Sequence, residues 1–113
     1  PLRISVVNVA EIVDVLRRVH TVSAAETSRA VDRFLDEVAQ PVTASREQAT
    51  LAADLRARHY HRRDRDLSLA DCFVIAAARP GDAIATSDRA VAQVARAEGM
   101  DVLALPNPRG LRP

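Results

Sequence analysis

Short apolar runs that alternate with helical patterns constrain the fold of this chain more than any other feature of its sequence. The runs at 3–7, 41–44, 83–86 and 101–105 are predicted as strands. Between them apolar residues recur at helical spacing, so the predicted order is strand, helix, helix, strand, helix, helix, strand, helix, strand. Strands that alternate with helices in this way predict an α/β protein, with a parallel sheet covered by helices on both faces.

Capping and turn residues predict where the helices begin and end. Side-chain oxygens suited to a helix N-terminus are expected at Asn8, Ser23, Ser45, Ser68 and Ser87 or Asp88. The apolar helix predicted over 69–79 stops at Pro80-Gly81, and Gly99 is the expected end of the last helix. The inward positions of the helix predicted over 45–59 and of the last helix are predicted to include Ala52, Leu55, Val91, Val94 and Ala95.

Length and composition exclude several classes of protein. The 113 residues, 48% of them hydrophobic and 27% charged, suit one globular domain, predicted over 1–105 with a tail at 106–113. No apolar run reaches the ~20 residues needed to cross a bilayer, and the N-terminal residues do not resemble a secretory signal, so we expect a cytoplasmic protein. The single cysteine, Cys72, excludes an internal disulfide and is predicted to fill the core.

Three acidic residues are candidates for a metal site. Asp71 is the only charged residue between Leu67 and Ala78, where an ionised carboxylate is costly without a partner. Asp71, Glu11 and Asp88 are each predicted in a first helical turn after a strand or turn, positions that converge beyond the carboxyl ends of parallel strands. Carboxylates suit Mg²⁺ or Mn²⁺. For any one acid alone, helix capping is the stronger interpretation, and only the set favours a metal.

Three segments of the chain are informative in their order and spacing: ISVVNVAEIVDVL, LSLADCFVIAAA and AIATSDRAVAQVARAEGMDV. They resemble successive signatures of the PIN-domain family, with the VapC toxins as the closest branch. The resemblance implies a three-layer domain with a central parallel sheet and a Mg²⁺- or Mn²⁺-dependent endoribonuclease. It assigns Glu11, Asp71 and Asp88 as catalytic metal ligands, with Thr86 and Ser87 beside the last acid to orient it or a metal-bound water.

The same resemblance implies partners and also a difference from the family. An RNA substrate, a cognate VapB-type antitoxin and a homodimer are the expected partners. The chain starts at what resembles the family's second strand, so a strand-plus-helix unit of about 30 residues, with an essential Asp, is expected to be absent. We expect a fragment of a longer PIN protein. The alternatives are a catalytically incomplete PIN scaffold that binds an antitoxin or oligomerises, and a generic α/β domain whose acids are only caps.

The segment 56–65 is the candidate RNA-binding region. All 16 basic residues of the chain are arginine, but the net charge is only +1, so any basic surface must be local. Its expected RNA contacts are Arg58, Tyr60, Arg62 and Arg63, with Tyr60 able to stack on a base. Asp64 and Asp66 reduce its charge, and a solvated helix end is the alternative interpretation. His59 and His61 are predicted not to chelate a metal together.

Overall fold

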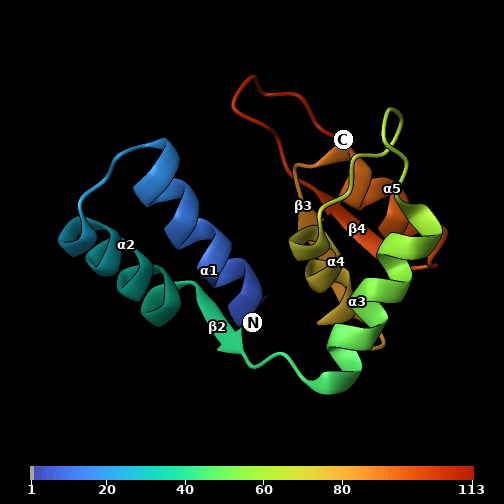
Figure 1. Ribbon diagram of the computed structural model, residues 1–113, viewed down its shortest axis with the longest axis horizontal. Coiled ribbons are helices and arrows are strands. Elements are labelled where there is room, and N and C mark those ends of the chain that lie inside the picture. The colour runs from blue at the N-terminus through green and yellow to red at the C-terminus, as the bar shows by residue number, and fades with distance from the viewer. Residues whose placement is uncertain (1) are drawn as a thin grey trace. The chain divides into compact units, whose positions relative to one another are not determined.

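The computed structural model describes residues 2–113 and follows the predicted order of strands and helices (Figure 1). The elements are β1 (Leu2–Ser5), α1 (Val6–Asp14), α2 (Ala24–Glu37), β2 (Ala39–Val42), α3 (Arg46–His59), α4 (Leu69–Ala76), β3 (Ala83–Thr86), α5 (Arg89–Ala97) and β4 (Asp101–Ala104). A short π-helix, η1 (Val15–Val19), extends α1. The strands pair in parallel, which confirms the predicted α/β class.

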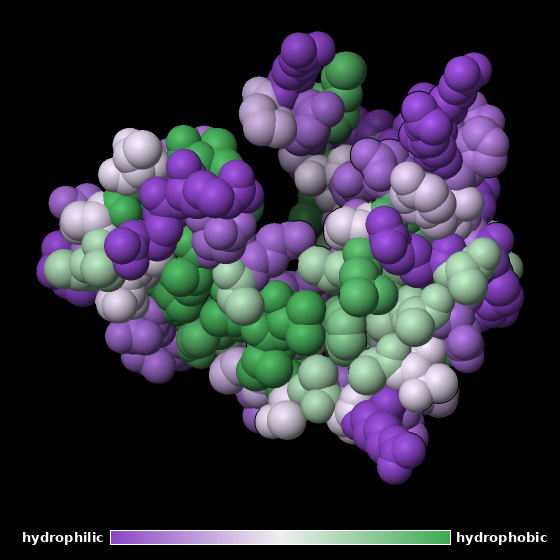
Figure 2. All heavy atoms as spheres, in the orientation of Figure 1, coloured by the Kyte–Doolittle hydropathy of each residue, from purple (hydrophilic) through white to green (hydrophobic). Residues whose placement is uncertain are grey.

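The chain forms two compact units, divided after Ser45. In the first unit β1 pairs with β2, from Leu2 opposite Ala39 to Ser5 opposite Val42. Helices α1 and α2 pack against each other and leave an apolar groove of about 140 Å³. The groove is lined by Val9, Ile12, Leu16, Val31, Phe34 and Leu35. Apolar residues show as green over α1 and α2 in Figure 2.

The second unit, Arg46–Pro113, contains the larger core. Strand β3 pairs with β4 from Ala83 opposite Asp101 to Thr86 opposite Ala104, while α3 packs on α4 and α5 packs on both strands. Its fully buried side chains include Ala52, Leu55, Leu67, Cys72, Val94 and Ala95. The inward positions predicted for α3 and α5 are therefore confirmed, and Cys72 fills the core as expected.

The four described strands form two separate two-stranded sheets. Parallel pairing was expected from the sequence, but within residues 2–113 no strand pairs with more than one other strand. Each sheet therefore keeps backbone groups on its edges that are not used in strand pairing.

Several predicted boundaries in the first unit are wrong, because hydrogen bonding moves them. The strand predicted over 3–7 ends at Ser5, and the strand predicted over 41–44 ends at Val42. Ser5, and not Asn8, begins α1, because the Ser5 hydroxyl accepts a hydrogen bond from the Val7 amide at 3.3 Å. Asn8 consequently lies inside the helix and is buried. Strand β2 begins at Ala39, two residues before Pro41, because Ala39 and the residue after it continue the pairing with β1.

The apolar helix α4 is shorter than predicted, ending at Ala76 and not at 79. The Ala78 amide turns back to the carbonyl of Ile75 at 3.1 Å, which tightens the last turn before Pro80. Among the described residues, no helix combines the length and apolar character that crossing a membrane requires.

Candidate functional site

Asp88 is the N-cap of α5 and is exposed at the end of β3. Its Oδ1 accepts a hydrogen bond from the Val91 amide at 3.0 Å, and its own amide donates to the Thr86 hydroxyl at 3.0 Å. Thr86 thereby orients the backbone that carries the carboxylate, whereas Ser87 makes no side-chain hydrogen bond in the described chain. Oδ2 of Asp88 has no hydrogen-bond partner among residues 2–113 and is available to a ligand.

Asp71 forms a capping box with Ser68 at the start of α4. Its Oδ2 accepts from the Ser68 amide at 2.9 Å, and the Ser68 hydroxyl accepts from the Asp71 amide at 3.0 Å. The neighbouring Cys72 is buried, and burial, followed by the charge of Asp71, raises the pKa of its thiol. Asp71 therefore has one oxygen fixed by the cap, while Cys72 stays protonated and is unsuited to act as a nucleophile.

Glu11 lies on α1, in the other compact unit from Asp71 and Asp88. Because Ser5 begins the helix, Glu11 falls in its second turn, and the first turn holds no acidic residue. The prediction that all three acids occupy a first helical turn is therefore wrong for Glu11. The carboxylate oxygens of the three residues are hard donors of the kind Mg²⁺ takes. In the part of the chain that the structure describes, no group of three or more His, Cys, Asp or Glu side chains is arranged to hold a metal ion.

The expected RNA-binding residues divide between a pocket and an exposed turn. Arg58 and Tyr60 line an open pocket of about 880 Å³ in the second unit. Arg62 and Arg63 lie outside its lining, in the turn closed by the backbone bridge between His61 and Arg65. Arg56 packs over the ring of Tyr60, 4.8 Å from its centroid. Hydrophilic residues cover this segment at the upper right of Figure 2.

Two further arginines line the pocket: Arg65, which belongs to the predicted RNA-binding segment 56–65, and Arg89, which was not among the predicted site residues. Arg89 directly follows Asp88 in the chain, so its position beside a candidate ligand was a usable signal. Arg65 belongs to the arginine-rich segment, but only the bend at 62–64 turns it toward α5. Sequence spacing alone does not reveal that bend.

The PIN domain family matches residues 1–97 of the chain, which span both compact units. This chain belongs to the PIN domain family. PIN domains are generally nucleases that act on nucleic acid with divalent metal ions. In this PIN domain, the cap of α4 and the cap of α5 supply the two aspartates that the motifs indicated. No curated protein and no solved structure matches the chain significantly.

Proposed function

We propose that this PIN domain is a Mg²⁺- or Mn²⁺-dependent endoribonuclease of the VapC toxin type. The observation that carries the proposal is the family match over residues 1–97, because PIN domains are generally nucleases. The toxin role is supported by the three sequence segments that resemble VapC proteins most closely. The apolar groove between α1 and α2 supports a protein partner, for which a VapB-type antitoxin or a second copy of the chain is proposed.

The proposed metal ligands are Glu11, Asp71 and Asp88. This assignment is supported by the hydrogen bonds of the two aspartates, since each cap uses one carboxylate oxygen and leaves the other for a ligand. A bound divalent cation would supply charge neutralisation at the scissile phosphate and a water of lowered pKa. The chain's own part is positional: the caps hold Asp71 and Asp88 in one rotamer, and Thr86 fixes the backbone of Asp88.

Cleavage of single-stranded RNA tests the proposal. The whole chain is incubated with a labelled oligonucleotide in Mn²⁺, as wild type and as Asp71→Asn and Asp88→Asn. Asparagine retains a capping oxygen but removes the charge, so the fold is preserved while the rate is expected to fall by at least about 100-fold. Asp101→Asn, an exposed acid at the start of β4, is the matched control and is expected to cut like wild type. Unchanged cleavage by both variants would exclude the proposed ligands.

A second candidate is a non-catalytic PIN scaffold that docks on a partner. It is supported by the two-stranded sheets, whose edges are not used in strand pairing among the described residues and are suited to strand addition from another chain. Calorimetric titration with Mn²⁺ separates the two candidates. Stoichiometric uptake that Asp88→Asn abolishes favours the nuclease, while no uptake together with no RNA cleavage favours the scaffold.

A further inference from the structure

The arginine-lined pocket lies between the end of α3, the segment 61–66 and the first turns of α5. Three guanidinium groups line it, from Arg58, Arg65 and Arg89. Their hydrogen-bond partners decide which of the three can take an anion. Arg58 is poorly placed to bind an anion, because it donates to Oε1 of Glu98 at 3.1 Å and to the carbonyl of Asp54 at 3.4 Å.

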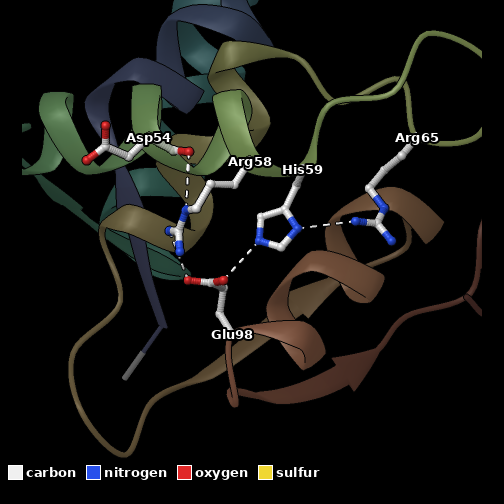
Figure 3. Close-up of polar contacts among 5 residues, drawn as sticks. All are labelled: Asp54, Arg58, His59, Arg65 and Glu98. Carbon is white, nitrogen blue, oxygen red and sulfur yellow. Dashed lines mark hydrogen bonds and ion pairs between the residues drawn. The ribbon is translucent and has the colours of Figure 1, made fainter.

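His59 connects Glu98 to Arg65, as Figure 3 shows. Its Nδ1 lies 3.2 Å from a terminal nitrogen of Arg65, and its Nε2 lies 2.9 Å from Oε2 of Glu98. Since a guanidinium only donates, Nδ1 must accept, and the ring proton must lie on Nε2 and point at the carboxylate. The side chain of His59 is only 14% exposed, so its ring is largely shielded from water.

Both carboxylate oxygens of Glu98 already have partners in this network. One oxygen accepts a hydrogen bond from Arg58 and the other accepts one from His59. These contacts hold the pKa of Glu98 below its usual value. Arg65 is therefore oriented through a neutral imidazole and has no carboxylate partner within residues 2–113. Its positive charge and its remaining N–H groups stay available at the pocket.

Arg89 supplies the second available charge. It is exposed, it has no hydrogen-bond or ion-pair partner in the described chain, and it begins α5 directly after Asp88. Asp64 and Asp66 also line the pocket, but both are exposed, so water screens them. Because Asp64 and Asp66 offset part of the charge of the two available guanidinium groups, the pocket suits a singly charged phosphodiester better than a polyphosphate.

We propose that Arg65 and Arg89 bind one phosphodiester of a single-stranded RNA next to Asp88, and that His59 is the positioning residue that aims Arg65 into the pocket. This assignment rests on the proposed nuclease function and names where the substrate strand enters. The geometry differs from that of an arginine-rich tail, because a partly buried chain of hydrogen bonds from Glu98 through His59 sets the direction of the Arg65 guanidinium.

RNA binding without cleavage tests the pocket. Fluorescence anisotropy of a labelled single-stranded oligonucleotide is measured in EDTA for the whole chain and for Arg65→Gln and Arg89→Gln. Each variant is expected to bind about 5- to 10-fold more weakly, and the two substitutions together are expected to reduce the salt dependence of log K by about 0.7, the value for one phosphate on a single strand. Arg96→Gln removes the same charge from α5 outside the pocket lining and is expected to stay within about 2-fold of wild type.

The positioning role of His59 has its own test. In His59→Gln the amide can donate to Glu98 and accept from Arg65, so RNA affinity is expected to be retained. His59→Ala is expected to weaken binding as much as Arg65→Gln does. The double variant that carries both His59→Ala and Arg65→Gln is expected to show no further loss, because both changes remove the same contact. Additive losses would show that His59 does not act through Arg65.

The outcomes separate this proposal from the nuclease proposal. If Arg65→Gln and Arg89→Gln bind RNA like Arg96→Gln while wild type still cleaves, the pocket is overturned and the nuclease stands. If Asp88→Asn binds RNA with wild-type affinity but no longer cleaves, while Arg65→Gln and Arg89→Gln bind more weakly, both proposals are supported. A wild-type chain that neither binds nor cleaves RNA overturns both. Thermal unfolding of each variant checks that a lost affinity is not lost folding.

Discussion

At the scale of single residues, each candidate aspartate has a structural role besides the proposed chemical one. Asp88 caps α5 and Asp71 caps α4, and each cap uses one oxygen of the carboxylate. The sequence left capping and metal binding as alternatives. The hydrogen bonds show that one oxygen of each carboxylate caps a helix while the other has no partner in the described chain. A suitable substitution can therefore remove the proposed metal binding and keep the cap.

Replacing Asp88 separates its capping role from its charge. Asp88→Ala is expected to reduce the free energy of unfolding by about 1 kcal/mol, because the Val91 amide loses its acceptor. Asp88→Asn is expected to unfold like wild type, although both variants are expected to lose RNA cleavage. Urea denaturation measures the stabilities. Equal destabilisation by the two substitutions would contradict the capping account.

Glu98 predicts a pH dependence of stability. Hydrogen bonding to His59, followed by the charge of Arg58, lowers the pKa of Glu98 in the folded chain. A lowered pKa stabilises the fold above the unfolded-state value of about 4.3, and this contribution disappears as the pH falls through the folded-state pKa.

Glu98→Gln is accordingly expected to be less stable than wild type at pH 7, by up to about 1 kcal/mol because the contacts are partly exposed. The difference is expected to shrink toward zero in acid, once the pH lies below the folded-state pKa of Glu98. Urea denaturation of both chains at the two pH values measures it. A difference that is the same at both values would show that the carboxylate charge does not contribute.

At the scale of the elements, packing of α3 on α4 holds the second unit together. Leu55 is 1% exposed and belongs to the core that α3 and α4 share, whereas Leu51, one turn earlier on the same helix, is 41% exposed. Arg58 and His59 lie at the end of this helix and Arg65 follows it closely, so its core contacts also position this side of the candidate RNA pocket.

Leu55→Ala and Leu51→Ala form a matched pair for this packing. Leu55→Ala is expected to lower the free energy of unfolding by about 2–4 kcal/mol, because it leaves a cavity in the core. Leu51→Ala is expected to cost less than about 1 kcal/mol. Urea denaturation of the two variants, analysed with the same m-value for both, measures their free energies of unfolding. Similar losses for the two variants would show that α3 does not use this face as the structure describes.

At the scale of the whole molecule, metal binding is expected to raise thermal stability. A ligand that binds only the folded chain adds RT ln(1 + [L]/Kd), or about 2.7 kcal/mol at 100 times Kd. Mn²⁺ is therefore expected to raise Tm, and EDTA to reverse the shift. Differential scanning fluorimetry measures it, with Asp88→Asn expected to show no shift and Asp101→Asn to match wild type. A shift that survives in Asp88→Asn would place the metal elsewhere.

The sequence by itself determined the order of the elements and most of their ends. Apolar spacing predicted every described strand and α-helix, and Ser23, Ser68 and Asp88 begin helices as expected, because caps depend on hydrogen bonds within a few residues. It erred at Asn8, where two nearby polar residues could cap the same helix and only the backbone path chose Ser5.

The tertiary structure alone decided the pairing of the strands in two sheets and the assembly of the pocket. His59 meets Glu98 across 39 residues of sequence, and Arg65 reaches the pocket only because the chain bends back at His61. Such contacts depend on how distant elements pack, and no local pattern encodes that packing. Family membership could be inferred from the motifs, whereas the side chains expected to bind RNA became distinguishable only once their partners in the fold were known.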